Sequence, residues 1–230
     1  MREKRIIKLV VNAIIFSIVA LVGAVSFLNI DSFGKTVIAP SRGGSIDSGV
    51  VSIVFRVIVD DNVEKAINIL DEKEADATFF VAGKWCAENP EILLEMVNKN
   101  YEIGNHGYLN RDFSALSFKE SLDEIKTTER TIENLCGYKC KLFMPPKGKF
   151  SDATLTSCEA LGYKMILWSR TAISDDGKEV YELATKEILS GEIVLLSLNE
   201  PTLSVLEDII DYYHGEGLQI KSVSVNIGVK

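Results

Sequence analysis

Short apolar runs alternate with amphipathic stretches from Val50 to the end of the chain. The apolar runs are rich in β-branched and aromatic residues and predict strands at residues 51–55, 77–82, 101–103, 141–144, 163–168, 192–198 and 218–223. Apolar residues recur at helical spacing between them, over residues 62–73, 88–100, 117–135, 152–161, 180–189 and 203–214. This alternation indicates one α/β domain of parallel strands over residues 50–230. It fits a parallel barrel and a doubly wound sheet equally well.

A strand–helix–strand unit over residues 76–106 is the best-defined part of this pattern. Its second strand ends in Gly104, Asn105 and His106. The crossover in such a unit makes the two strands parallel, so their C-terminal ends lie at the same rim of the sheet. Because α/β folds carry their functional groups at that rim, His106 is the first candidate for a functional side chain.

The first 49 residues differ in character from the rest. Residues 1–8 carry four basic side chains and one acidic side chain, and residues 9–30 contain no ionisable side chain. That apolar length spans a bilayer, and the basic flank predicts a cytoplasmic N-terminus with the remainder of the chain outside. We expect a transmembrane anchor at residues 9–30, a tether at residues 31–49, and a single-pass protein of the cell membrane. A signal peptide cleaved near the small residues 24–26 is the alternative.

Charge narrows the classes of partner. The sequence has 25 Lys and Arg against 33 Asp and Glu, which gives a net charge of −8. Since residues 1–8 hold several of the basic side chains, the part beyond the anchor is more acidic still. This balance argues against nucleic acid as a partner.

Four cysteines, Cys86, Cys136, Cys140 and Cys158, lie in the part expected outside the cell. Disulfides persist there, and four cysteines allow three complete pairings. Cys136 and Cys140 are close in sequence and would close a small loop between a helix and a strand. Free, buried thiols are the alternative.

Five segments of the expected domain form an ordered set of motifs. They are residues 77–83 (ATFFVAG), 102–106 (EIGNH), 143–146 (FMPP), 161–168 (LGYKMILW) and 192–196 (EIVLL). Together they resemble the polysaccharide deacetylase (NodB homology) domain of the family 4 carbohydrate esterases, over about residues 50–225. The resemblance implies a distorted (β/α) barrel of about seven parallel strands, here preceded by one N-terminal transmembrane helix.

The resemblance also implies a reaction. In that family, one Asp and two His hold a divalent metal that polarises the acetamide of an N-acetylated sugar for attack by a metal-bound water. A second Asp acts as base, a late-strand His as acid, and an Arg and a third Asp orient those two. Of these seven positions, this sequence keeps only His106. The others hold Arg56 (base), Val57 (metal Asp), Asn110 (second His), Met144 (Arg), Thr171 (third Asp) and Ser197 (late His).

These replacements predict that the catalytic and metal sites are lost, and we expect no cofactor. Val57 would fill with carbon the space of a metal and its water, and Met144 avoids burying an arginine whose carboxylate partner is gone. One His with one Asn nearby is a poor zinc site, because catalytic zinc takes three protein ligands. An alignment shifted onto Asp60 and Asp61 is a second possibility, although such a pair more commonly caps the following helix.

Other residues on the expected rim are candidates for ligand binding. Trp85 and Tyr108 are placed on rim loops, where an aromatic ring would stack on a sugar face. Lys147 follows two prolines in a loop that faces substrate in the family, and its charge would attract an acidic glycan. With His106 and Asn110, these residues are the candidates for a binding groove.

We therefore expect a membrane-anchored, extracytoplasmic polysaccharide deacetylase-like protein that is catalytically inactive and binds a cell-wall polysaccharide or an envelope protein. One alternative is an active, zinc-dependent deacetylase of peptidoglycan or chitin type, whose site is rebuilt from His106 and Asp60 or Asp61. The other is a structural subunit of envelope or spore assembly.

Overall fold

The computed structural model describes residues 12–20, 39–59 and 62–229. Residues 12–20 form a helix, and the compact domain that begins at Ala39 is a separate unit. No helix of the described residues is long and apolar enough to cross a membrane. The expected anchor at residues 9–30 lies mostly outside the described residues, and so do Asp60 and Asp61.

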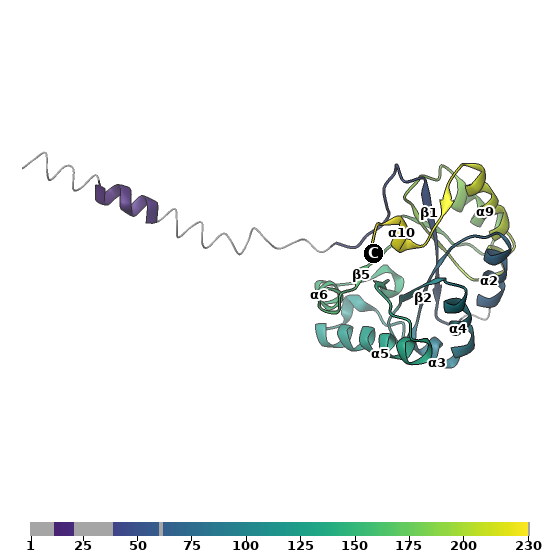
Figure 1. Ribbon diagram of the computed structural model, residues 1–230, viewed down its shortest axis with the longest axis horizontal. Coiled ribbons are helices and arrows are strands. Elements are labelled where there is room, and N and C mark those ends of the chain that lie inside the picture. The colour runs from purple at the N-terminus through teal and green to yellow at the C-terminus, as the bar shows by residue number, and fades with distance from the viewer. Residues whose placement is uncertain (1–11, 21–38, 60–61, 230) are drawn as a thin grey trace, which may run out of the picture. The chain divides into compact units, whose positions relative to one another are not determined.

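The domain is built around strand β1 (Val50–Val57), which pairs in parallel with β2 (Thr78–Val81), β7 (Ile193–Leu196) and β8 (Gln219–Ile220). The strand order is β5-β4-β3-β2-β1-β7-β6. The outer strands are β3 (Glu102–Asn105), β4 (Leu142–Phe143), β5 (Lys164–Met165) and β6 (Arg170–Ala172). These seven strands curve into a half-barrel (Figure 1), which confirms the expected α/β fold of about seven parallel strands.

Helices cover the outside of this half-barrel. They are α2 (Val63–Glu72), α3 (Gly83–Glu88), α4 (Pro90–Asn98), α5 (Phe118–Cys136), α6 (Asp152–Leu161), α7 (Gly177–Thr185), α8 (Glu200–Leu203) and α9 (Leu206–Gly215). In contrast, α10 (Val223–Asn226) places Val223 in the cluster on the inner side of the strands. A capping box of Ser117 and Glu120 starts α5, and Gly137 ends it in the left-handed conformation, at φ 71°.

Two expectations from the sequence are corrected by the structure. The helix expected over residues 88–100 begins at Pro90, a residue favoured at a first helical position, and the strand expected over residues 163–168 is only β5, with β6 following it.

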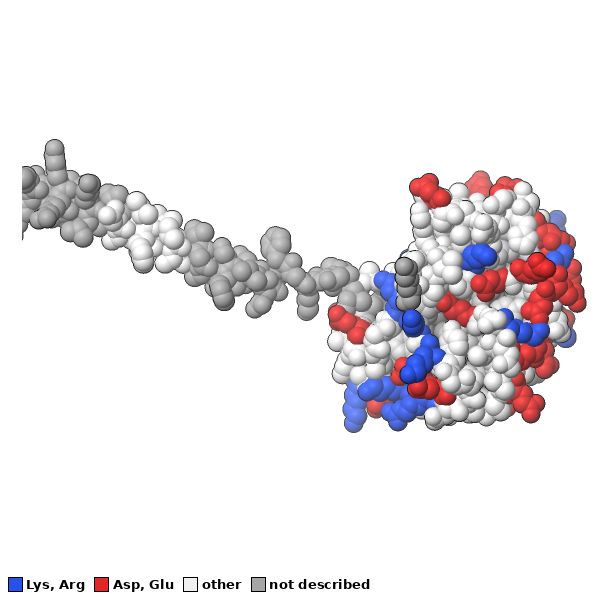
Figure 2. Space-filling model, viewed as in Figure 1, with Lys and Arg blue, Asp and Glu red and all other residues white. Residues whose placement is uncertain are grey.

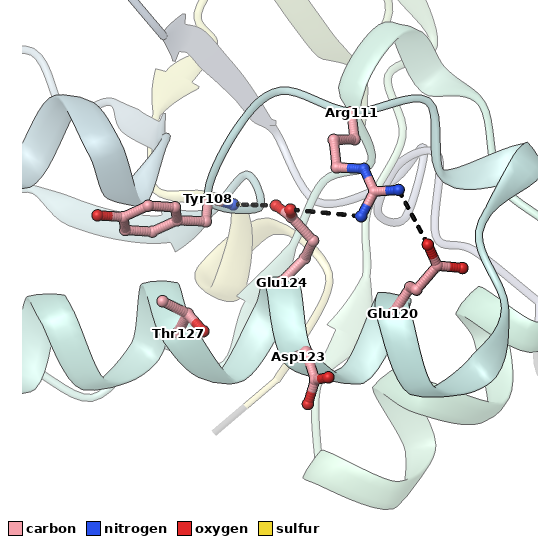
Figure 3. Close-up of a pocket in the computed structure, with 6 residues that line it drawn as sticks. All are labelled: Tyr108, Arg111, Glu120, Asp123, Glu124 and Thr127. Atoms are coloured by element: carbon pink, nitrogen blue, oxygen red, sulfur yellow. Dashed lines mark hydrogen bonds and ion pairs between the residues drawn. The ribbon is translucent and has the colours of Figure 1, made fainter.

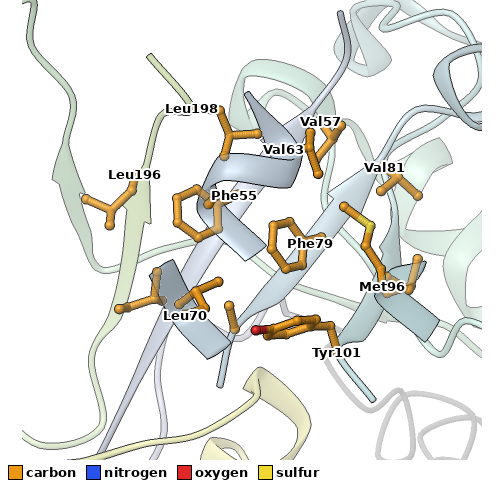
Figure 4. Packing of buried hydrophobic residues seen from close by; sticks show 14 of the residues in the cluster. Phe55, Val57, Val63, Leu70, Phe79, Val81, Met96, Tyr101, Leu196 and Leu198 are labelled. Carbon is orange, nitrogen blue, oxygen red and sulfur yellow. The ribbon is translucent and has the colours of Figure 1, made fainter. Parts of the chain in front are cut away.

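The side chains of β1 alternate between two apolar clusters. Phe55 packs towards the helices with Phe79, their ring centroids 5.3 Å apart, and Tyr101 meets Phe79 edge-on (Figure 4). Val54 lies in the smaller cluster enclosed by the strands, with Phe80, Leu142, Met144, Ile166, Ile193, Leu195 and Val223. Because successive residues of a strand face opposite sides, Arg56 shares the inner face with Val54.

The described part of the expected tether, from Ala39 on, is bound to the domain. Ser41 exchanges two backbone hydrogen bonds with Met165 and Leu167 beside β5, of 2.9 and 2.8 Å. Two residues later the chain bridges to the start of β7, where the Gly44 amide donates to the Gly191 carbonyl at 2.8 Å. The segment therefore links the β5 edge to β7 and supplies partners for an otherwise open edge.

The expected disulfide between Cys136 and Cys140 is absent, and all four cysteines are free thiols. Cys136 is still part of α5, and its thiol donates to the Ile132 carbonyl one turn back, at 3.1 Å. Cys140 is buried in the core, where burial raises the pKa of its thiol. The alternative of buried thiols therefore describes the structure, apart from the half-buried Cys136.

We predict that Gly44→Ala destabilises the domain by about 1–3 kcal/mol, the usual cost of overpacking. A Cβ on Gly44 would meet the Asn226 carbonyl oxygen at 2.1 Å, and backbone cannot swing aside as a flexible side chain can. Chemical denaturation measures the loss. Gly215→Ala is the matched control, since nothing lies within 4 Å of its Cβ. Equal stabilities for the two variants would show that residues 39–45 are not docked as described.

Candidate functional site

His106 directly follows β3 at the C-terminal rim and is completely buried. Its Nδ1 lies 2.7 Å from the Met144 carbonyl oxygen. Since a carbonyl only accepts, Nδ1 carries the proton and Nε2 keeps a lone pair. Among the described residues Nε2 has no hydrogen-bond partner. Burial, and to a lesser degree the charge of Arg56, lower the pKa of His106 to about 3, so the ring is neutral at physiological pH.

Arg56 lies at the end of β1 on the inner face. Its guanidinium carbon is 5.8 Å from the centroid of the Trp168 ring, and the Trp168 indole N–H donates to Thr171 Oγ1 at 2.7 Å. Burial lowers the pKa of Arg56. No carboxylate of the described residues pairs with it, and the position that would carry the base of the family holds a cation. The Trp168 residue is half-buried beside Arg56.

Val57 and Met144, the two apolar replacements, lie on different sides of the strands. Met144 is fully buried in the inner cluster, as expected. Val57 is equally buried but packs on the helix side, near Val63 and Val81 (Figure 4). The two-residue period of β1 turns Val57 away from the face that holds Arg56.

The other replaced positions have local structural roles. Ser197 donates to Asn199 Oδ1 at 2.7 Å, within the hydrogen-bond group that starts α8. Thr171, exposed on β6, accepts from Trp168. Asn110 adopts a left-handed conformation at φ 54° and makes no side-chain hydrogen bond among the described residues. Of the family positions, His106 contacts the Met144 carbonyl and lies close enough to Arg56 for its charge to act on the ring.

The residues expected to line a binding groove differ in their exposure to solvent. Trp85 is 2% exposed within α3, so it offers no ring face to a sugar, and that expectation was wrong. The Trp85 ring instead contributes to the hydrophobic core, because α3 packs against α5. Tyr108 is half-buried, and Lys147 is exposed in a left-handed turn at φ 58°.

A shallow cavity of about 170 Å³ opens beside Tyr108 (Figure 3). Its walls are Tyr108, Arg111, Glu120, Asp123, Glu124 and Thr127. The carboxylates of Glu120 and Glu124 are already engaged. Glu124 Oε2 accepts from the backbone N–H of Tyr108 at 2.7 Å, and Glu120 pairs with Arg111 at 3.0 Å. These contacts therefore stabilise the conformation of the loop after His106.

The residues around His106 do not fit the divalent metal that the resemblance implies. Nε2 is oriented as in ligating histidines, whose second nitrogen usually donates to a carbonyl or carboxylate. Its surroundings are wrong, however, because Arg56 brings a positive charge and Met144 an apolar side chain. Within residues 12–20, 39–59 and 62–229, no three His, Cys, Asp or Glu side chains gather as metal ligands.

We predict that His106 weakens the fold in acid. Its pKa falls from 6.5 to about 3 on folding, so the unfolded chain binds more protons across that window. The free energy of unfolding therefore decreases as pH falls from about 6.5 towards 3, by at most about 1.4 kcal/mol per pH unit. Denaturation between pH 4 and 7 should give a shallower slope for His106→Gln than for the unchanged protein. The exposed His214→Gln variant is the control, and identical slopes for all three would refute the prediction.

Comparison with known proteins finds relatives of this chain in Bacillus subtilis. It is similar to the uncharacterized protein YlxY of Bacillus subtilis, with 27% identity over 189 residues, which cover 80% of this chain and 59% of that protein. It is similar to the peptidoglycan-N-acetylmuramic acid deacetylase PdaA of the same organism, at 26% identity over 69% of this chain and 64% of that enzyme. The chain thus spans less than two thirds of the length of either relative.

The fold is similar to that of a family 4 carbohydrate esterase pseudoenzyme from Bacillus anthracis. The TM-score is 0.79 at 26% identity, covering 82% of this chain and 69% of that one. A mutant of that pseudoenzyme with restored enzymatic activity gives a TM-score of 0.80 at 25% identity. The sequence profile of the polysaccharide deacetylase family matches residues 44–166. This chain belongs to the polysaccharide deacetylase family, within the family 4 carbohydrate esterases.

Proposed function

We propose that this protein is a non-catalytic polysaccharide deacetylase-like protein that binds a cell-wall polysaccharide outside the cell. The basic flank and the apolar residues 9–30 support a membrane anchor, with the domain on the extracytoplasmic side. An envelope protein is the second class of partner. No cofactor takes part in this function.

Arg56 is the observation that carries the proposal. A base must take a proton, and a guanidinium stays protonated at any physiological pH. Its positive charge beside His106 also opposes a divalent cation, whereas the Asp expected there would attract one. A single change of charge sign thus removes the base and disfavours the metal.

The relatives support a wall-directed role. PdaA is by its name a peptidoglycan deacetylase, and a structural neighbour of comparable identity is a pseudoenzyme of the same family. Loss of the catalytic carboxylates does not by itself remove a surface that could meet a glycan, because binding and chemistry depend on different side chains.

An active deacetylase with a rebuilt site is the second candidate. The lone pair of His106 Nε2 favours it, because the Met144 carbonyl holds the ring in the tautomer that a metal needs. Asp60 or Asp61 would have to supply the carboxylates. The known reaction of the family would then follow, with zinc or another divalent metal as cofactor.

Sedimentation with purified peptidoglycan sacculi, combined with an acetate assay, separates the two. We expect the full chain to sediment with the sacculi and to release no acetate above the level of its His106→Ala variant. An active deacetylase such as PdaA is the positive control. Acetate release that disappears in His106→Ala would establish the second candidate. Failure to sediment would contradict glycan binding and direct attention to envelope proteins.

A further inference from the structure

We infer that Arg56 and Lys147 form a site for an oxyanion, a carboxylate or phosphate group, carried by the bound saccharide. This inference rests on the proposed glycan binding and adds the chemical class of the glycan.

The first ground is the charge of Arg56. Its guanidinium is partly withdrawn from water, which is why burial lowers the pKa of this side chain. No hydrogen bond or ion pair joins it to another described residue. Transferring a charge out of water costs free energy unless a partner compensates, and aromatic contact compensates only in part. Among the described residues, the guanidinium thus has no hydrogen-bond acceptor.

The second ground is that the guanidinium is held in place. Trp168 lies under it at 5.8 Å, and the indole N–H is fixed by Thr171 at 2.7 Å. The edge of the same ring packs against Gly148, where an added Cβ would meet the ring at 2.9 Å. A preorganised donor loses less entropy on binding than a free surface arginine.

The third ground is a second cation on the adjoining loop. Lys147 precedes Gly148, which touches Trp168, so it belongs to the same part of the rim. Its neighbour Lys149 is paired with Asp112 at 3.4 Å, whereas Lys147 is exposed and has no ion pair among the described residues. Arg56 and Lys147 thus lie near the same tryptophan, without an ion pair among the described residues, and their charges favour an anion.

These cations stand out against an acidic molecule. The net charge is −8, and a cavity of about 480 Å³ between α2 and α4 is lined by Glu64, Glu88, Glu91 and Glu95, with Asn89, Pro90 and Ile92. Figure 2 shows carboxylates gathered at the edge of the domain that carries α2 and α4. The overall field therefore repels anions, so attraction at Arg56 must come from direct contact.

The shape of guanidinium determines the ligand group. Its planar fork donates two parallel hydrogen bonds to a carboxylate or phosphate, an arrangement that a lysine ammonium cannot reproduce. A sugar acid or a sugar phosphate presents such a group beside a ring, and a neutral N-acetylated sugar does not.

Three sugars with one ring test this inference: N-acetylglucosamine, N-acetylmuramic acid, which adds a carboxylate, and N-acetylglucosamine 1-phosphate. Titrations of the full chain follow the Trp168 indole N–H signal by NMR. We expect at least one acidic sugar to bind about tenfold more tightly than the neutral sugar, which corresponds to about 1.4 kcal/mol. Which acidic sugar binds distinguishes a carboxylate source from a phosphate source. The preference should shrink as salt rises.

Substitutions identify the group responsible. Arg56→Met should abolish the preference, Arg56→Lys should retain part of it, and Lys147→Gln should weaken it. Arg130→Met is the matched control, because Arg130 is an exposed arginine on α5 without an ion pair among the described residues. Equal affinities for the three sugars, or a preference that survives in Arg56→Met, would overturn the inference.

The outcome is separable from that of the proposed function. Binding to sacculi without any preference for acidic sugars leaves the proposed function standing and overturns the oxyanion site. If no sugar binds but inorganic phosphate shifts the Trp168 signal in an Arg56-dependent way, the oxyanion site stands and the saccharide does not. If neither phosphate nor any sugar binds, the inference fails outright.

Discussion

The two-residue period of β1 is the constraint on which the site depends. This strand pairs with β2, β7 and β8 at once, so its register is fixed on both sides. A register shift of one residue would turn Phe55 from the helix-side core to the inner face of the strands, and would turn Arg56 into that core. Because the register is fixed, Arg56 has to face the inside and Val57 the helices.

The remaining features of the rim are compatible with that placement. Arg56 already places one positive charge on the inner face, so a second buried cation nearby would be unfavourable. The position of the family arginine accordingly holds Met144. His106 remains neutral, and its hydrogen bond to the Met144 carbonyl ties the end of β3 to the residue after β4. Met144, Thr171 and Ser197 thus have local packing or hydrogen-bonding roles that do not require a metal.

Much of the fold could be predicted from the sequence. Strands with continuous apolar runs and helices with capping signals, such as α5 at Ser117, lie close to the expected residues. Short elements at the sheet edge could not be predicted in the same way. β6 consists of Arg170, Thr171 and Ala172, and its strand conformation comes from pairing with β7 rather than from its own pattern.

The site was predicted in part, for reasons that lie in packing. The alignment identified Arg56 and Met144, but only the pairing of β1 shows on which side Val57 lies. Gly83 suggests that a loop begins there and that Trp85 belongs to it, yet Trp85 lies in helix α3 and packs into the core. Likewise, Gly43 and Gly44 suggest a flexible tether, although a side chain on either would collide with the backbone of Gly191 or Asn226. Such contacts join residues far apart in the chain, and local sequence carries little trace of them.

Calorimetric titration of the full chain with zinc and cobalt tests the central claim, loss of the metal site, most directly. The His106→Ala variant gives the background level. The account predicts no binding above that background for the unchanged protein. Stoichiometric binding that is lost in His106→Ala would contradict it, and would show that residues near His106 still assemble a metal centre.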